Sequence, residues 1–254
     1  MNRVLLLGGT SESRWISQML LARGVDVIGS VTTPSARALF APGVREIFVG
    51  QFTEKSLGEF LKSKTVNTVL DATHPFAVEI SNRAMQICHE TKTPYVRYER
   101  PSLQGNFLWA PSLESVVEAW CQEHGNALVA TGAKKLQPFL RLELQGRVYF
   151  RLWKTELGKA AVDQAGLAPE QIWWDEPNPT AASVRDFLTA KQIRFAVVKD
   201  SGPQGMALTL ASICPTLGVR LHVLERPKLR YPLAASTPHA LEGIFAERPF
   251  EKVR

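Results

Sequence analysis

The chain has 254 residues, of which 45% are hydrophobic and 21% charged, and its net charge is +6. This length suits one large domain or two of about 100–150 residues, and no apolar run reaches the roughly 18 residues that a membrane span needs. The three cysteines are widely spaced and form no CxxC pair, which is typical of packing residues in a reducing compartment. We therefore expect a cytoplasmic protein without a membrane partner.

The positive charge favours an anionic ligand. Nucleic acid is one explanation, but the lysines and arginines form no dense basic run and no nucleic-acid-binding signature, so we expect no such partner. A phosphate-bearing cofactor or a polycarboxylate accounts for the charge equally well. The five histidines lie far apart without HxH or HxxxH spacing, and we expect no metal site.

Short apolar runs alternate with helical patterns through the first half of the chain. Residues 4–7 form a continuous apolar run, as expected for a parallel strand buried on both faces. The glycines that follow turn the chain into a helix that ends near Gly24. Further strands are predicted at 25–28, 46–49, 68–70 and 95–98, with helices around 57–61 and from Pro75 onward.

After a loop at 102–113 the same alternation begins again. Strands are predicted at 127–130, 148–151, 195–198 and 221–224, and helices around 116–120, 180–190 and 203–214. The pattern predicts an α/β fold of two Rossmann-like, doubly wound parallel-sheet halves with a cleft between them. We place the halves at 1–112 and 113–254, and the tail beyond Tyr231 could pack back on the first half.

Two stretches half a chain apart follow one plan. Asp71 and Lys199 lie 128 positions apart, as do Pro75 and Pro203. In each stretch an apolar strand stops at polar residues, and a helix is expected to begin at the proline. This repeat predicts two similar halves whose loops face one cleft.

The run Gly8-Gly9-Thr10-Ser11-Glu12 joins the first strand to its helix. Small residues at this position let a pyrophosphate approach the backbone N–H groups of a helix N-terminus, although an ordinary tight turn is the alternative. The second strand ends near Ser30, Thr32 and Arg37, with no acid to hold a ribose 2′-hydroxyl. Hydroxyls and an arginine favour the 2′-phosphate of NADP, while a plain strand exit is the alternative.

Polar loops at three other strand ends are candidate ligand sites, because open α/β sheets bind ligands there. Asp71 and His74 follow one strand, although Asp71 could only cap the turn and His74 could only donate to a carbonyl. Lys199 ends another strand next to Gly202, and a lysine there is costly to bury without an anion. The third loop, Thr131-Gly132-Ala133-Lys134, has the same character.

Five segments together resemble the precorrin-6A reductase family of cobalamin biosynthesis, including its cobalt-precorrin-6A branch. The segments are Gly8-Gly9-Thr10-Ser11-Glu12, Asp71-Ala72-Thr73-His74-Pro75-Phe76-Ala77, Arg97-Tyr98-Glu99-Arg100-Pro101, Thr131-Gly132-Ala133-Lys134 and Lys199-Asp200-Ser201-Gly202. The resemblance implies two Rossmann-like halves, a reduced nicotinamide at the glycine-rich loop and hydride delivery to one double bond of a tetrapyrrole. One departure is that the family's lysine, a few residues into the helix after Gly205, is absent here.

The resemblance assigns expected roles to the candidate residues. NADPH, with NADH as the alternative, would bind in the first half at Gly8, Gly9, Thr10, Ser11, Glu12, Ser30, Thr32 and Arg37. The polycarboxylated substrate would bind at Asp71, Thr73, Arg97, Arg100, Lys134, Lys199, Ser201 and Gly202, mainly against the second half. His74 or Asp200 would supply a proton. The alternatives are an oxidoreductase of another polycarboxylate and a dinucleotide-sensing module without turnover. Oligomeric state and the presence of cobalt in the substrate stay open.

Overall fold

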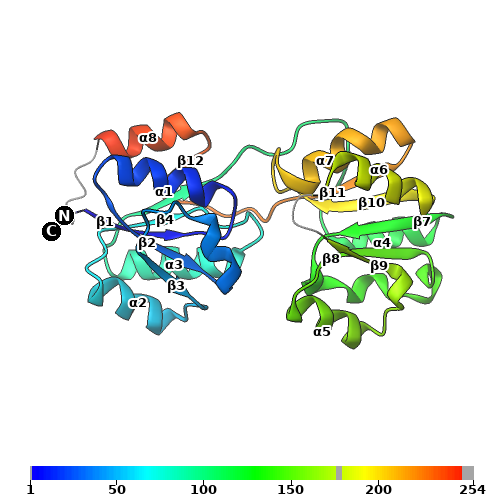
Figure 1. Cartoon of the computed structure of the whole chain (residues 1–254), viewed down its shortest axis with the longest axis horizontal. Coiled ribbons are helices and arrows are strands. Elements are labelled where there is room, and N and C mark those ends of the chain that lie inside the picture. The colour runs from blue at the N-terminus through cyan, green and yellow to red at the C-terminus, as the bar shows by residue number, and fades with distance from the viewer. Residues whose placement is uncertain (1, 176–178, 248–254) are drawn as a thin grey trace. The chain divides into compact units, whose positions relative to one another are not determined.

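A computed structural model describes residues 2–175 and 179–247 of the chain (Figure 1). The chain forms two compact units. Unit 1 holds the residues up to Pro101 and those from Pro227 onward, and unit 2 spans Ser102–Arg226. No described helix is both long and apolar enough to cross a membrane.

Unit 1 is a six-stranded parallel sheet in the order β12-β5-β4-β1-β2-β3. Helices α1 and α8 cover one face, and α2 and α3 cover the other (Figure 1). Its elements are β1 (Arg3–Leu7), α1 (Glu12–Ala22), β2 (Asp26–Val31), η1 (Pro34–Leu39), β3 (Glu46–Val49), α2 (Glu54–Ser63), β4 (Thr68–Asp71), α3 (Val78–Glu90), β5 (Tyr95–Tyr98), β12 (Ala234–Ala235) and α8 (Pro238–Glu247).

Unit 2 is a second six-stranded parallel sheet, in the order β6-β11-β10-β7-β8-β9. Helices α6 and α7 lie on one face, and α4 and α5 on the other (Figure 1). Its main elements are β6 (Leu108–Ala110), α4 (Leu113–Cys121), β7 (Asn126–Ala130), η2 (Ala133–Lys135), β8 (Val148–Trp153), α5 (Glu156–Ala165), β9 (Ile172–Asp175), α6 (Ala181–Ala190), β10 (Ile193–Lys199), α7 (Gly205–Ile213) and β11 (Arg220–Leu224).

Strands β1–β5 and β7–β11 follow the same order in the two sheets, and each sheet receives its sixth, edge strand from the chain that has just crossed from the other unit. After β5 the chain enters unit 2 as β6 and pairs with β11. After β11 it re-enters unit 1 as β12 and pairs with β5. The prediction of two parallel-sheet α/β halves is therefore confirmed, and unit 1 is not one continuous segment.

The crossing points differ from the boundary expected near residue 112. The chain crosses at Pro101 and returns at Pro227. The sequence pattern did not reveal β6, because Leu108 and Trp109 are both exposed and the strand has only three residues. A pattern read along the chain also cannot show a return to the first sheet, since β12 has only two residues.

Local sequence explains where most elements begin. The strand β1 is an unbroken apolar run, and Val4, Leu5 and Leu6 are fully buried, as parallel strands covered on both faces require. Several of the described helices begin at a residue whose side-chain hydroxyl accepts a hydrogen bond from the backbone N–H three residues later. Such a cap stabilises a helix by about 1 kcal/mol. These N-cap residues are Thr53, Ser112, Thr155 and Thr180.

The prediction that helices begin at Pro75 and Pro203 is wrong. Helix α3 begins at Val78 and α7 at Gly205. In both loops a short backbone hydrogen bond forms a turn before the helix: Ala77 N–H donates to the His74 carbonyl at 2.7 Å, and Gln204 N–H donates to the Gly202 carbonyl at 2.7 Å. These tight turns delay the first helical residue.

Candidate functional site

The two glycines after β1 are required for different physical reasons. A Cβ on Gly8 would lie 2.6 Å from the ring of Phe40 and 2.7 Å from Ser13 Oγ, so a larger residue cannot fit there. Gly9 has a φ of +101°, which side-chain-bearing residues rarely adopt, and a Cβ there would have nothing within 4 Å. The space beside the Gly9 Cα is therefore open to an approaching ligand, while Gly9 N–H donates to Ser13 Oγ at 3.2 Å.

The start of helix α1 is fastened to two neighbouring strand ends. Thr10 Oγ1 donates to the Ala72 carbonyl at 2.8 Å. The carboxylate of Glu12, 2% exposed, pairs with Arg100 at 3.1 Å. The Ser11 side chain makes no capping bond to the helix, so the N-cap residue does not compete with an anion for the first-turn N–H groups.

The second strand ends with the expected hydroxyls and arginine. Ser30 is buried, and its carbonyl accepts a hydrogen bond from Gly8 N–H at 2.9 Å. Thr32 and Arg37 are exposed, the latter in the short helix η1. Together with the open space at Gly9 and the uncapped α1, these residues fit the phosphates of a dinucleotide. Glu12 and Arg100, in contrast, pair with each other inside the protein, although Glu12 Oε1 has no hydrogen-bond partner among the described residues.

Asp71 is the centre of a buried network at the end of β4. Its carboxylate is 0% exposed and accepts five hydrogen bonds. The donors are Thr73 N–H and Oγ1, Ser81 Oγ, Tyr95 Oη and Arg97 Nη1, at 2.6–2.9 Å. Burial raises the pKa of Asp71, but Arg97 and these hydroxyls outweigh it and hold the pKa below its ordinary value.

Arg97 lies inside the same network. Its side chain is 1% exposed, and it pairs with Asp71 and Glu99, each at 2.8 Å. The ring of Tyr231 lies 5.2 Å from its guanidinium, and burial is the main reason that the pKa of Tyr231 is raised to about 12. Arg97 therefore holds Asp71 in place. Its side chain does not reach the surface, where a ligand could contact it.

His74 follows this network and is half-buried. Phe76 N–H donates to His74 Nδ1 at 3.2 Å, so the neutral imidazole carries its hydrogen on Nε2. Thr73, one residue earlier, is buried and donates to Asp71 at 2.7 Å. The Asp71 network therefore fixes the loop that presents His74.

Asp200 occupies the corresponding position in unit 2. It is 2% exposed and accepts hydrogen bonds from Ser102 Oγ at 2.5 Å, Leu103 N–H at 2.9 Å and Gly202 N–H at 3.1 Å. Arg226 pairs with its carboxylate at 2.9 Å. Asp200 thus holds the Ser201-Gly202 turn in place, with Ser201 half-buried and Gly202 buried beside it.

Three lysines gather where β7 and β10 end. Lys199 is half-buried, while Lys134 and Lys135 are exposed in η2. Burial lowers the pKa of Lys199, and the positive charges of Lys135 and Lys134 lower it further. Thr131 lies in the same loop and is 5% exposed, and its buried hydroxyl has no hydrogen-bond partner among the residues that the structure describes. This lysine cluster (Lys134, Lys135 and Lys199) is suited to an anion.

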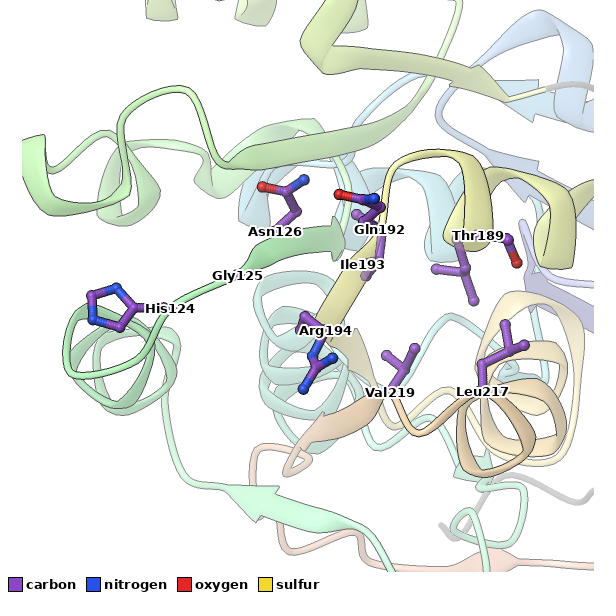
Figure 2. Close-up of a pocket in the computed structure, with 10 residues that line it drawn as sticks. His124, Gly125, Asn126, Thr189, Gln192, Ile193, Arg194, Leu217 and Val219 are labelled. Carbon is purple, nitrogen blue, oxygen red and sulfur yellow. The ribbon is translucent and has the colours of Figure 1, made fainter.

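A cavity of about 670 Å³ lies at the opposite end of the unit 2 sheet. Figure 2 shows Asn126, Gln192 and Arg194 around it, at the starts of β7 and β10. Open α/β sheets bind their ligands at the carboxyl ends of the strands, and the cavity contains none of the expected site residues. Among the residues that the structure describes, no group of three or more His, Cys, Asp or Glu could hold a metal ion.

The sequence pattern missed several residues of these loops. Lys135 was indicated only by its position next to Lys134. Phe40 is buried against Gly8 and Gly29, where a Cβ would lie 2.6 and 2.8 Å from its ring. No local signal connects Tyr231 with Arg97, because 134 positions separate them.

Known proteins resemble this chain over most of its length. A family model described as "Precorrin-6x reductase CbiJ/CobK" matches residues 3–244. The cobalt-precorrin-6A reductase of Synechocystis is 31% identical over 89% of this chain and 88% of its own, and that of Priestia megaterium is 28% identical over 92% and 94%. A solved structure titled "CobK precorrin-6A reductase" has the same fold, with a TM-score of 0.78, 22% identity and full coverage of both chains.

Proposed function

This chain belongs to the precorrin-6x reductase family CbiJ/CobK, and we propose that it catalyses the NADPH-dependent reduction of one double bond in precorrin-6A or its cobalt form. It is an oxidoreductase of cobalamin biosynthesis. The proposed reaction with NADPH rests on a chemical difference between the strand-end loops of the two units. Unit 1 has a helix N-terminus without a side-chain cap, and unit 2 has the lysine cluster.

The cofactor is assigned to unit 1. Gly9 and the first turn of α1 would hold the pyrophosphate, and exposed Thr32 and Arg37 would hold the 2′-phosphate. When bound, the reduced nicotinamide supplies the hydride, while the protein supplies position and electrostatics.

The substrate carboxylates are assigned to the lysine cluster. A bound anion stabilises the charged form of a lysine that is partly buried beside two other positive charges. His74, whose Nε2 carries the hydrogen in the neutral ring, is proposed to order the water that delivers the proton, because a neutral imidazole is itself a very weak acid. Asp200 suits that role less well, because its carboxylate already accepts hydrogen bonds from four partners.

The function is tested by adding the purified chain to NADPH with precorrin-6A and, separately, with cobalt-precorrin-6A. We expect oxidation of NADPH that requires one of the two tetrapyrroles, and the rates show which metal state is preferred. Binding of NADPH without turnover of either tetrapyrrole would instead support a sensing module.

Arg37→Ala should raise the KM for NADPH by about tenfold, because one charge-assisted contact to the 2′-phosphate is lost. The KM for NADH, which lacks that phosphate, should not change. Steady-state kinetics with both cofactors measures the ratio, and exposed Arg45→Ala is the matched control. Equal changes in the two KM values would remove Arg37 from the cofactor site.

Lys199→Gln should raise the KM for the tetrapyrrole by about 10–100-fold, because a charge-assisted contact is lost.

Since Lys135 contributes to the lowered pKa of Lys199, Lys135→Gln should raise that pKa. Lys199 then stays charged to higher pH, so the alkaline fall in kcat/KM should move upward. A pH profile measures this shift, with Lys62→Gln of unit 1 as the control; an unmoved alkaline limb would contradict it.

A further inference from the structure

Two large apolar side chains are exposed where β8 leads into α5. Trp153 is 53% exposed and Leu157 is 60% exposed. They lie at the carboxyl end of a parallel strand, the edge at which such sheets bind ligands. Single exposed apolar residues are common on protein surfaces. These two differ because they lie on a hydrogen-bonded turn beside a cluster of positive charges.

The turn that carries these side chains is rigidly built. Thr155 N–H donates to the Trp153 carbonyl at 2.8 Å, and Thr155 Oγ1 accepts from Gly158 N–H at 3.1 Å. A Cβ on Gly158 would lie 2.2 Å from the Trp153 carbonyl oxygen, so only glycine allows this approach. Arg151, which pairs with Asp175, lies 5.9 Å from the centre of the Trp153 ring. The backbone that carries Trp153 is therefore fixed, and the exposed indole lies beside a charged side chain.

The same turn lies next to the lysine cluster. Val129 of β7 pairs with Phe150 of β8, so the two strands leave the sheet side by side. The short helix η2, which carries Lys134 and Lys135, packs against α5. On the other side of β7, Ala130 pairs with Val198, which brings Lys199 to the same edge.

We propose that Trp153 and Leu157 form an apolar platform for the face of the tetrapyrrole macrocycle, while the lysine cluster binds its peripheral carboxylates. This inference rests on the proposed function. A tetrapyrrole is a broad ring with apolar faces and an anionic rim, and an indole with positive charges beside it complements both features. Removing the ring face from water against Trp153 favours binding, and the lysines fix its orientation.

The platform is tested by Trp153→Ala and Trp153→Phe, with Trp109→Ala as the matched control. Trp109 is 41% exposed and lies in β6, the outermost strand of the same sheet, which β11, β10 and β7 separate from β8. We expect Trp153→Ala to raise the KM for the tetrapyrrole by about tenfold with little change in the KM for NADPH. Phenylalanine should restore most of the affinity, and Trp109→Ala should leave it unchanged.

A second measurement does not depend on turnover. Uroporphyrin, a stable octacarboxylate macrocycle, should quench tryptophan fluorescence of the wild type, and the quenching should fall in Trp153→Phe but not in Trp109→Phe. An unchanged KM in Trp153→Ala together with unchanged quenching in Trp153→Phe would overturn the platform while leaving the reductase function intact. If the wild-type protein does not oxidise NADPH when either tetrapyrrole is added, the proposed reductase function itself is overturned.

Discussion

Asp71→Asn is expected to destabilise the protein by about 3 kcal/mol, the largest stability effect that we predict for a single polar substitution. The change removes the charge that balances buried Arg97, and an asparagine cannot accept all five hydrogen bonds that the carboxylate accepts now. The midpoint of thermal unfolding should fall by about 6–12 °C. Differential scanning calorimetry or urea unfolding measures this loss.

Asp26→Asn is the matched control. Asp26 also pairs with an arginine, Arg3, at 2.6 Å, but both side chains are about one-third exposed. An ion pair in contact with water contributes less than about 1 kcal/mol. Equal losses of stability in the two variants would show that the buried network contributes no more to stability than the exposed pair.

The lowered pKa of Asp71 also predicts how stability depends on pH. A carboxyl whose pKa is depressed in the folded protein stabilises it above the unfolded pKa of about 3.9, and this contribution is lost as the pH falls through the folded pKa. The wild type should therefore lose stability steeply below about pH 4. Asp71→Asn should show a shallower acid limb, because asparagine does not titrate.

Gly9→Ala is expected to raise the KM for NADPH by at least about tenfold, the largest effect that we predict on the cofactor. The new methyl group would meet no protein atom within 4 Å. It would instead stand in the open space above the α1 N-terminus that is assigned to the pyrophosphate. Isothermal titration calorimetry with NADPH measures the loss of affinity without the tetrapyrrole.

Gly24→Ala separates this steric effect from backbone strain. Gly24 has a φ of +71°, and a Cβ there would also have nothing within 4 Å, but this glycine lies at the far end of α1. Both variants should lose about 1 kcal/mol of stability because both backbones are left-handed. Only Gly9→Ala should bind NADPH more weakly, and unchanged binding in both would move the cofactor away from this loop.

The two units repeat an Asp–Arg pair more closely than they repeat the flanking loops. Asp71 pairs with Arg97, and Asp200 pairs with Arg226. The two aspartates are 129 positions apart in the chain, and so are the two arginines. Each aspartate also accepts the N–H of the residue two positions on. The repeat in the sequence instead matches Asp71 with Lys199, one position earlier. The aspartates therefore hold the turns in both units, and the lysine is an addition of unit 2.

The strands were predictable where burial extends to both faces. The strand at 95–98 agrees with the structure and is buried throughout, as a strand covered on both faces requires. The strand at 46–49 also agrees, although it is only partly buried at the sheet edge, because residues 47–49 form a short apolar run. Helix α5 and strand β9 were missed. Helix α5 buries only Gly158 fully, and β9 is mostly half-buried, so neither shows a clear apolar period.

The candidate site was less predictable than the fold. Arg97, Arg100 and Asp200 are polar residues in or just after the last residues of a strand, and Glu12 begins the helix after β1. Ligand contacts are also found at such positions. In the structure each of these four residues is buried against a protein partner. An ion pair between residues 26 or 88 positions apart leaves no local pattern, so the sequence could not separate these residues from the exposed ones.

By itself, the sequence determined the α/β class, the two parallel-sheet halves and the family. These features depend on local apolar runs and on motifs that are contiguous in the chain. Only the tertiary structure decided which strand-end residues hold the turns and which face outward, and that β6 and β12 complete the sheets after each crossing. Burial and strand pairing join residues that are distant in the chain, and such long-range contacts are set by packing of the whole unit.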